Sequence, residues 1–342
     1  MKSFTACLVT VTLLFLLPAK AAVLEVGLSG TGYAYPDIQQ AYQAASSGDT
    51  ILVHAGLYTM RYGTEYSLNT GYDYSIGGVP TVKKENIVIR AAGDGPAIMT
   101  GIIGLQGTAA GVGNITIDGL YVNPETVANK VGVQINPASN YMAGCTIRNV
   151  VVYGTHIQRG VYLRDTPQYQ GQHLIEHCTF YNVDPNGSYK GLDDRIVGTK
   201  TAPMVPIMRS NISVGFDTSF YTWGGGPGET FAYSDAYNWI TGAYVPSSYK
   251  GTGSVELDPL FYSLDPNDPY FLYLSNDSPS ALKTGAHDGT YMGALPVLVL
   301  ECGDWGYSEV DINRDCYVNL ADLAIFVSKW LECTDLTNPE CN

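Results

Sequence analysis

Short runs of alternating apolar and polar residues recur between residues 114 and 197. The run NITIDGL at 114–120 returns as GCTIRNV at 144–150 and as HLIEHCT at 173–179. Shorter echoes (GVQI, GVYL, GLDD) begin at Gly132, Gly160 and Gly191, which are 28 and 31 residues apart. Repeats of this length, built from short β-branched strands, are typical of solenoids. The pattern therefore predicts an all-β stack of coils.

The alternation also predicts which side chains face the inside of the coils. Neighbouring strand residues point to opposite faces, so aligning the echoes at their glycines assigns each position to a face. The apolar positions predicted to point inward are Val133, Ile135, Val161, Leu163 and Leu192. The polar positions predicted to point outward form two columns, Gln134, Tyr162 and Asp193 in the first and Asn136, Arg164 and Arg195 in the second.

A short amphipathic helix is predicted ahead of these repeats. Ile38, Ala41, Tyr42 and Ala45 have the spacing of one apolar helix face, and the sequence SSGD that follows ends the pattern. Residues 50–53 (TILV) are then predicted to form a buried strand.

The segment YPDIQQAYQAASSGDTILVHAGLYTM, residues 35–60, resembles the capping helix and first coil of right-handed parallel β-helices of the pectin-lyase type. The resemblance covers about residues 23–296. It implies a right-handed parallel β-helix whose N-terminal helix covers the open end of the stack. Such folds carry many activities, so the resemblance favours a fold more strongly than a function.

The pattern loosens beyond Thr218. Aromatic segments at 221–226 and 233–249 are predicted to be long excursions from the coils. Regularity returns at 254–261, and the segment from Asp268 to Pro296 resembles the closing coils of these β-helices.

Charge and composition narrow the function. Charged residues make up only 15% of the chain, and the formal net charge is −14. The absence of a basic stripe argues against nucleic acid as a partner. The negative charge also disfavours capture of a polyanion, unless calcium or a local cationic patch mediates it.

The N-terminus has the features of an export signal, predicted at residues 1–21. Lys2 precedes the apolar run 8–17, and Ala19-Lys20-Ala21 fits a small-x-small cleavage site. The run is too short to span a bilayer. The protein is therefore expected to be secreted or extracellular, with a mature β-helix domain at 22–296 and no transmembrane segment.

A calcium loop is predicted in the C-terminal tail, after a short linker at 297–301. Oxygen ligands stand at positions 1, 3, 5, 7, 9 and 12 of such a loop. The predicted ligands are Asp311, Asn313, Asp315, Tyr317 through its backbone carbonyl, Asn319 and Asp322. An amphipathic helix follows, with an apolar face of Leu323, Phe326, Val327, Trp330 and Leu331.

The segment DINRDCYVNLADLAIFVSKWL resembles one repeat of a type I dockerin, the calcium module that docks bacterial carbohydrate-active proteins onto cohesins. Two features depart from that family: Cys316 stands where calcium loops have Gly, and there is one repeat instead of two. The module, predicted at 302–342, contains Cys302, Cys316, Cys333 and Cys341. The favoured pairing is Cys302 with Cys316 and Cys333 with Cys341, one of three that four cysteines allow. The resemblance implies a cohesin-like partner and attachment at a cell surface.

The outward columns carry the candidate chemistry. Guanidinium groups clamp carboxylates, and a carboxylate or tyrosine can move a proton. The candidate catalytic residues are Asp193, Arg195, Arg164, Tyr162 and Lys190, and the candidate substrate contacts are Gln134, Asn136, Trp223 and Tyr221. His156, Arg159 and His177 lie near them in sequence. The alternative is a polar ladder in which Asp–Arg pairs only solvate this face.

Two mechanisms remain open. β-Elimination, as in related polysaccharide lyases, needs a base such as Arg195, Lys190 or Arg164 to take the C5 proton of a uronate, with Tyr162 near the leaving oxygen. Hydrolysis needs two carboxylates, and Asp193-Asp194 resembles the pair of polygalacturonase-type hydrolases. Their accompanying motifs are missing here, and Asp194 is expected to point into the core unless a bulge intervenes.

Three functions therefore compete: a secreted polysaccharide lyase or hydrolase, a non-catalytic glycan-binding or cell-surface β-helix, and a structural solenoid with only a protein partner. The dockerin resemblance favours the first by association.

Overall fold

The computed structural model describes residues 21–59, 65–71, 84–106, 112–125, 127–136, 144–164, 171–184, 187–195, 205–223, 226, 228–298, 310, 318 and 320–329. The predicted export signal lies outside these residues except for Ala21. The predicted calcium ligands and the four tail cysteines also lie outside them, as does the side chain of Asp322, whose backbone belongs to a described helix.

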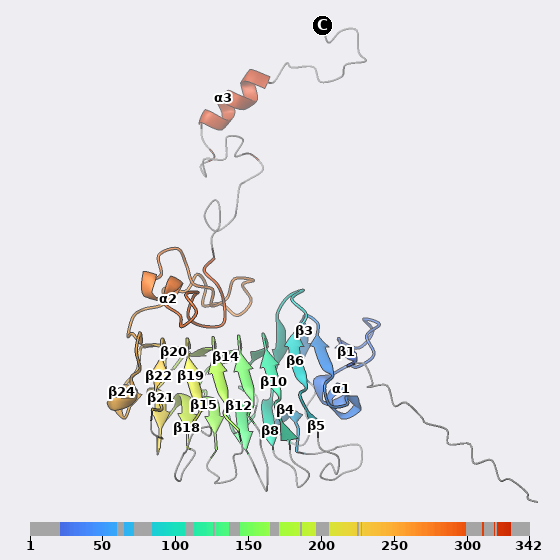
Figure 1. Cartoon of the computed structure of the whole chain (residues 1–342). Helices are drawn as coiled ribbons and strands as arrows, with labels where there is room; N and C mark the ends of the chain where they lie inside the picture. The colour runs from blue at the N-terminus through green and yellow to red at the C-terminus, as the bar shows by residue number, and fades with distance from the viewer. Residues whose placement is uncertain are drawn as a thin grey trace, which may run out of the picture.

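Three parallel sheets form the body of the protein, and each coil contributes at most one strand to each sheet (Figure 1). Sheet A contains β1 (Val23–Val26), β2 (Thr50–Val53), β6 (Val88–Ala91), β10 (Thr116–Asp118), β13 (Thr146–Arg148), β16 (Leu174–Glu176), β19 (Ile207–Arg209) and β22 (Phe231–Ala232). Sheet B contains β3 (Gly56–Tyr58), β7 (Ala97–Met99), β11 (Tyr121–Val122), β14 (Val151–Gly154), β17 (Thr179–Asn182), β20 (Ile212–Val214) and β23 (Asp235–Tyr237). Sheet C contains β4 (Tyr66–Asn69), β8 (Ile102–Gln106), β12 (Val131–Asn136), β15 (Arg159–Leu163), β18 (Lys190–Asp194), β21 (Thr218–Thr222) and β24 (Gly242–Val245).

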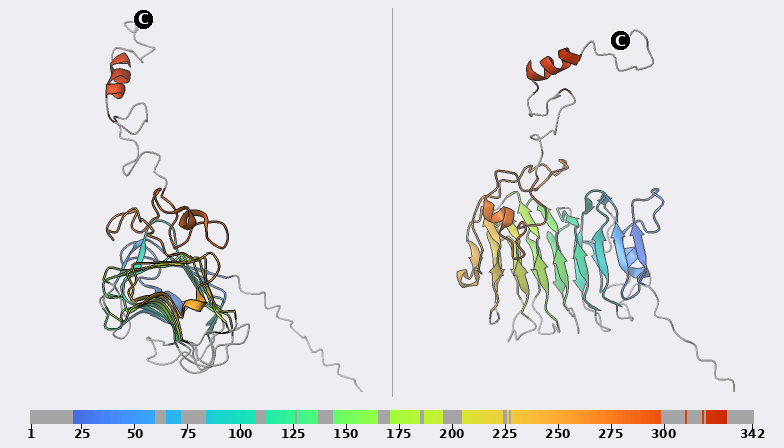
Figure 2. Two further views of the ribbon diagram at one scale, coloured as in Figure 1. Left: turned by 90° about the vertical axis from the view of Figure 1, so that its left-hand side faces the viewer. Right: turned by 45° about the horizontal axis from the view of Figure 1, so that its top comes forward.

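The remaining described elements are few. They are the paired strands β5 (Lys84–Glu85) and β9 (Val112–Gly113), the helices α1 (Ile38–Ala44), α2 (Ser280–Thr284) and α3 (Leu320–Lys329), and the 3-10 turn η1 (Ser247–Tyr249). The described chain is thus an all-β parallel solenoid, compatible with a parallel β-helix. Viewed along its axis, it forms a ring of three walls around a common interior (Figure 2).

The interior is a stack of apolar side chains in register. Val133 pairs with Val161, and Val161 pairs with Leu192 in the next coil. All five positions predicted to face inward (Val133, Ile135, Val161, Leu163 and Leu192) are fully buried in one core. The alternation of the sequence therefore predicts the inner face correctly.

The repeated glycines of sheet C are required by close packing between coils. A Cβ at Gly160 would lie 2.5 Å from the carbonyl oxygen of Gly191, and one at Gly132 would lie 2.7 Å from that of Gly160. Larger residues at these positions would push neighbouring coils apart, which explains why the echoes begin with glycine.

The turns from sheet A to sheet B share one backbone conformation. Gly119, Asn149, His177, Ser210 and Tyr233 follow successive strands of sheet A, and all have a left-handed φ between 49° and 73°. Gly and Asn adopt this conformation most readily. His, Ser and Tyr also occupy this position, so the backbone conformation of the turn is kept while the residue type differs from coil to coil.

Helix α1 begins and ends close to the predicted positions. The Asp37 side chain accepts a hydrogen bond from the Gln40 backbone at 2.9 Å, as an N-cap does. The four predicted apolar residues Ile38, Ala41, Tyr42 and Ala45 are all buried in the common core. Gln39 donates to the Asn69 carbonyl at 3.2 Å and accepts from its amide at 2.7 Å, which joins the helix to β4.

The prediction of aromatic excursions after Thr218 is wrong. Strands β21 to β24 continue all three sheets, and Tyr221 pairs with Asp193 in register. Ser219 stands in line with Gly191, and buried Phe220 replaces Leu192. The coil therefore continues with larger inner residues and without the marker glycine.

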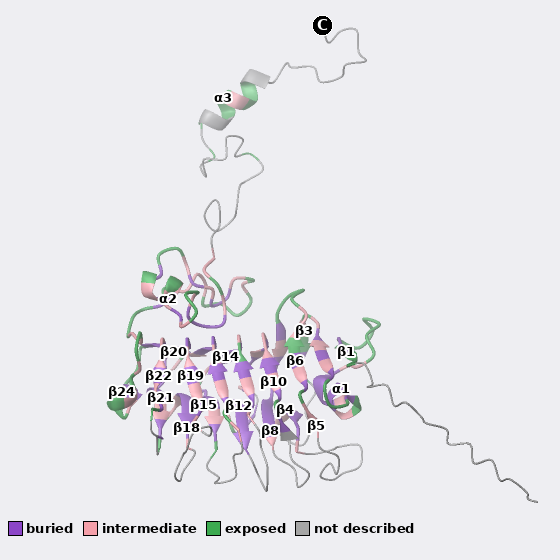
Figure 3. Ribbon diagram, viewed as in Figure 1, coloured by how far each residue is buried: buried purple, intermediate pink, exposed green. Residues whose placement is uncertain are grey.

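The resemblance of residues 268–296 to closing coils implied further coils at the C-terminal end of this domain. The structure shows no such coils in these residues. Residues 256–298, which we call the covering segment, fold back over the outer face of sheet B (Figures 1 and 2). Leu274, Leu282 and Met292 pack against Ile212 and Val214 of β20. Phe271 and Leu272 pack against Val151 and Tyr153 of β14. Figure 3 shows the buried residues in both the strands and this segment.

Helix α3 lies where an amphipathic helix is predicted in the tail. The apolar residues Leu323, Phe326 and Val327 of this helix are 52%, 46% and 60% exposed. None of the helices in the described residues has the length and apolar character needed to span a membrane.

Candidate functional site

The predicted outward column of sheet C is a continuous row of side chains. Gln134 of β12 pairs with Tyr162 of β15, which pairs with Asp193 of β18, which pairs with Tyr221 of β21. Regular parallel pairing of β-strands holds these four positions next to one another, although they come from different coils. The structure therefore brings together four of the predicted site residues, including Tyr221, which the predicted column did not contain.

Asp193 is the centre of this site. Its side chain is completely buried although it points to the outer face. Arg159 donates from Nε to Oδ2 at 2.7 Å, and Arg195 donates from Nε to both carboxylate oxygens at 3.1 Å. Two guanidinium groups thus enclose one carboxylate. Asp193 holds the two cations in place and is not open to a substrate.

Arg159 is a site residue that the sequence analysis did not select. It pairs with Lys190 in register. Its guanidinium carbon also lies 4.4 Å from the ring centroid of Tyr162, a cation–π distance. The glycine alignment contains the signal, because Arg159 and Lys190 both precede a marker glycine. Strict alternation would point this position to the core, since it lies two residues before Val161.

Lys190 and Arg195 share the ring of Tyr221. The Lys190 Nζ lies 4.9 Å from the ring centroid and the Arg195 guanidinium carbon 5.9 Å from it. Burial lowers the pKa of Lys190 below its ordinary value, with Asp193 opposing the shift and Arg195 and Arg159 adding to it. Burial disfavours the charge of Arg195, but the Asp193 carboxylate outweighs it and raises the pKa of Arg195. Of the two cations, Lys190 is the one that can lose a proton.

The remaining predicted contacts are less uniform. Gln134 and Asn136 occupy outward positions but are only 9% and 7% exposed. They are therefore not accessible to a ligand, contrary to the prediction that they contact a substrate. The reason is crowding: a Cβ at Gly104, the neighbour of Gln134 in the row, would lie 2.8 Å from the Tyr66 ring. Large rings therefore flank Gln134 on both sides, Tyr66 and Tyr162.

Two of the predicted residues lie toward solvent beside the row. Arg164 follows β15 and is exposed, and its amide donates to the Ile135 carbonyl at 3.0 Å. Trp223 follows β21 and is 64% exposed. Its amide donates to the Asp194 carbonyl at 2.8 Å, which places it one coil beyond Arg195. An exposed tryptophan therefore borders the cationic cluster.

Asp194 points inward, as the alternation predicts. It pairs with Leu163 and Thr222, is fully buried, and accepts a hydrogen bond from the Thr222 hydroxyl at 3.1 Å. Asp193 and Asp194 therefore face opposite sides of β18. They do not form a pair of carboxylates on one face.

Two described cysteines, Cys145 and Cys178, are buried as thiols in the core. Burial raises the pKa of each thiol to about 12, so both are unreactive thiols that fill space.

The fold and this face define an all-β parallel solenoid with a cationic and aromatic cluster on one wall. Comparison with known proteins assigns no family: no protein-family model matches the chain, and no curated protein matches it in sequence.

Proposed function

We propose that the protein is a secreted carbohydrate-active β-helix protein that binds an acidic polysaccharide along the outer face of sheet C and cleaves it by β-elimination. The observation that carries this proposal is the convergence of Arg159, Lys190 and Arg195 around Asp193. The whole chain has a net charge of −14, so a local excess of cations is the feature that a uronate carboxylate requires.

Aromatic residues support a sugar as the ligand. Tyr162, Tyr221 and Trp223 lie along the same row of coils as the three cations. Aromatic rings offer flat apolar faces to sugar rings, and Trp and Tyr are enriched at binding sites for this reason. A chain of uronates would pair its carboxylates with Arg159 and Arg195 and its ring faces with these side chains.

Lys190 is the proposed base. As a neutral amine it takes the proton from C5 of a uronate, and the electron pair forms the C4–C5 double bond as the C4–O bond breaks. Tyr162 gives its phenolic proton to the leaving oxygen. The positive charge of Arg159 and Arg195 stabilises the carboxylate as negative charge develops beside it. The lowered pKa of Lys190 supports its role, since the base must be deprotonated to act.

The position of the aspartates favours elimination over hydrolysis. A glycoside hydrolase needs two carboxyl groups that flank one bond. Asp193 and Asp194 lie on opposite faces of β18, and Asp193 is already enclosed by arginines. The resemblance to polygalacturonase-type hydrolases therefore receives no support from this pair.

The termini complete the proposal. The N-terminal residues 1–21 act as an export signal, and α1 caps a right-handed β-helix of the pectin-lyase type. The dockerin-like module at 302–342 binds Ca²⁺ through the loop that begins at Asp311 and attaches the enzyme to a cohesin-like protein. These statements rest on sequence resemblance.

A panel of acidic and neutral polysaccharides tests the activity. The full-length protein should release unsaturated uronate ends, seen as ultraviolet absorbance, from an acidic polymer and leave neutral ones intact. Lys190→Gln should lower turnover by about 10²–10⁴-fold with little loss of binding. The matched control is Lys250→Gln, since Lys250 also lies near an aromatic ring (Tyr244, 5.4 Å) and a carboxylate (Glu256, 2.8 Å).

The alternative is a non-catalytic glycan-binding β-helix protein. The hydrogen bonds between Asp193 and its two arginines favour this function. Charged groups that are already paired can hold a glycan without transferring a proton to it. Retention of acidic polysaccharide without new ends of any kind would establish it. New reducing ends without unsaturated products would instead contradict elimination.

A further inference from the structure

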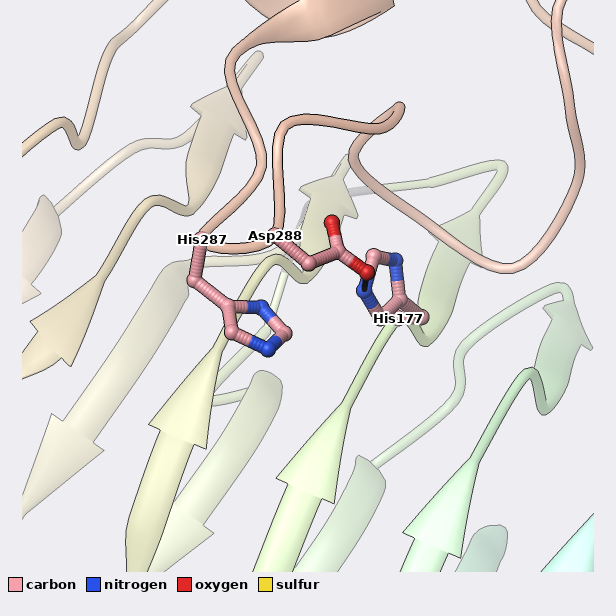
Figure 4. Close-up of side chains that lie close together, drawn as sticks. All are labelled: His177, His287 and Asp288. Carbon is pink, nitrogen blue, oxygen red and sulfur yellow. Dashed lines mark ion pairs between the residues drawn. The ribbon is translucent and has the colours of Figure 1, made fainter.

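A second cluster of side chains lies away from sheet C, where the covering segment meets the body. His177 follows β16 in the left-handed turn between sheets A and B, and His287 and Asp288 belong to the covering segment. One ligand atom from each of the three lies within 4.8 Å of the other two. Figure 4 shows the Asp288 carboxylate next to the His177 ring, with the His287 ring to one side of this pair.

We propose that His177, His287 and Asp288 bind a divalent transition metal, with Zn²⁺ as the best fit, and that the metal fastens the covering segment to the solenoid. Two imidazoles and one carboxylate are the donor set that zinc prefers, whereas calcium and magnesium prefer oxygen alone.

The distance between His177 and Asp288 fits this ion. Zinc–ligand bonds of about 2.0–2.2 Å in a tetrahedron place neighbouring ligand atoms about 3.3–3.5 Å apart. His177 Nε2 and Asp288 Oδ2 are 3.4 Å apart. His177 Nε2 is buried and makes no hydrogen bond, even though the Asp288 carboxylate is its neighbour. A buried ring nitrogen without a hydrogen bond normally carries a cost, which a metal ion would remove.

The neighbouring groups orient the ligands. The Ser210 hydroxyl lies 2.8 Å from Nδ1 of His287, so Nε2, which lies 3.6 Å from Glu176 Oε2, is the nitrogen that can bind a metal. Thr290 donates from its amide and its hydroxyl to Oδ1 of Asp288, at 3.0 and 2.6 Å, which leaves Oδ2. Metal sites in proteins use such hydrogen bonds to fix the ring and carboxylate orientation.

The electrostatics permit a cation at this place. Arg209 of β19 is the cation paired with Glu176 beside this cluster, and it donates to Glu176 Oε2 at 3.0 and 2.8 Å. Glu176 therefore neutralises Arg209 and leaves the Asp288 charge for the metal. Asp288 is 44% exposed in its side chain, so the ion can enter from solvent.

The test uses the full-length protein, stripped of metal with a chelator and kept without reductant so that any disulfide in the tail is not reduced. Zn²⁺ should bind in calorimetry and raise the midpoint of thermal unfolding, whereas Mg²⁺ should not. Cobalt(II) added instead should give the visible bands of a tetrahedral site.

Two variants remove ligands with little disturbance. His177→Asn introduces the residue that the preceding coil has at this turn, Asn149, and Asp288→Asn keeps Oδ1 for Thr290. Since changes next to a ligand already weaken metal sites about 10–100-fold, each variant should lose at least that much affinity, one equivalent of zinc and the cobalt bands.

The matched control is His156→Asn. His156 also has a left-handed φ of 58° and also faces one carboxylate, Asp184 at 3.6 Å. This variant should bind zinc like the parent protein. The proposal is overturned if the parent chain binds no zinc at micromolar concentration, or if its zinc stoichiometry is the same in both ligand variants.

Discussion

The outer faces of sheets B and C belong to the same coils but have opposite characters. The outer face of sheet B is apolar at Val151, Tyr153, Ile212 and Val214, and the covering segment buries it. The outer face of sheet C presents Tyr162, Lys190, Arg195 and Tyr221, and the one apolar cluster described against them is small: Tyr162 packs on Ile102, Val127 and Val131. In a solenoid the inner side chains determine the stack, and the outer ones determine which wall is packed and which is exposed. Substitutions on the two walls should therefore have different consequences.

The largest effect on stability is expected under the covering segment. Leu274 is fully buried against β20, so Leu274→Ala should lower the free energy of unfolding by about 2–5 kcal/mol, through lost burial and the cavity that remains. Denaturant unfolding followed by circular dichroism measures it. Leu264→Ala is the control, since Leu264 lies in the same segment and is 53% exposed; it should change stability by less than about 0.5 kcal/mol. Equal effects of the two would mean that the segment does not pack on sheet B.

The next effect concerns Asp235, which holds the start of the covering segment. Its carboxylate accepts a hydrogen bond from the Leu257 amide at 2.9 Å, while Oδ2 is buried without a partner. Burial raises the pKa of Asp235 from 3.8 to about 7. The folded protein therefore binds one more proton than the unfolded chain between these values, and stability should fall as pH rises through this window.

Asp235→Asn should remove this contribution. At a pH about one unit above 7 the variant should be more stable than the parent by about 2–4 kcal/mol, since each unit of pKa difference corresponds to about 1.4 kcal/mol. Near pH 4 the two should be alike. Unfolding midpoints of both proteins across this range measure the difference, and parallel pH profiles would contradict it.

Asp193→Asn tests the wall of sheet C by removing the charge between Arg159 and Arg195. Loss of one partner of a buried ion pair destabilises by about 3–5 kcal/mol, and the partial exposure of the arginines (22% and 32%) reduces this to about 1–3 kcal/mol. Thermal and denaturant unfolding check it. The matched control is Asp118→Asn on sheet A, whose Arg148 partner is 46% exposed; it should cost about 0–1 kcal/mol. If Asp193→Asn cost as little stability as Asp118→Asn, solvent would screen the charges around Asp193 as it does those around Asp118.

The two walls also explain what the sequence could predict. The inner alternation at Val161, Leu163 and Leu192 repeats from coil to coil because every coil must fill the same core, so it is visible in one sequence. The register of Tyr162 with Asp193 follows from it, and that part of the site is predicted correctly. Tyr221 was assigned to a loop because Ser219 and Phe220 replace the glycine and leucine of the pattern.

Two other features escape a rule based on alternation. Arg159 stands at the first residue of its strand, where the turn lets its side chain reach Asp193 in the next coil instead of the core. The covering segment consists of short turns, isolated bridges and the short helix α2, with Leu274 pairing antiparallel to Phe261, so its apolar residues resemble strands without forming coils. Its place on sheet B depends on contacts between distant parts of the chain, such as Ala294 with Thr179 at 2.9 Å.

The smallest effect on stability and the most specific effect on binding are expected at Trp223. It is 64% exposed, so Trp223→Ala should change the free energy of unfolding by less than about 0.5 kcal/mol. If acidic polysaccharide lies along sheet C, the lost aromatic face should weaken binding by about 1–2 kcal/mol, or 5–30-fold, as measured by affinity electrophoresis. Trp239→Ala is the matched control, because Trp239 is also exposed, at 39%, but lies in the turn after β23 of sheet B. Equal loss of binding in both variants would mean that an exposed tryptophan contributes to binding on either sheet. The difference between the outer faces of sheets B and C would then be a difference in packing alone.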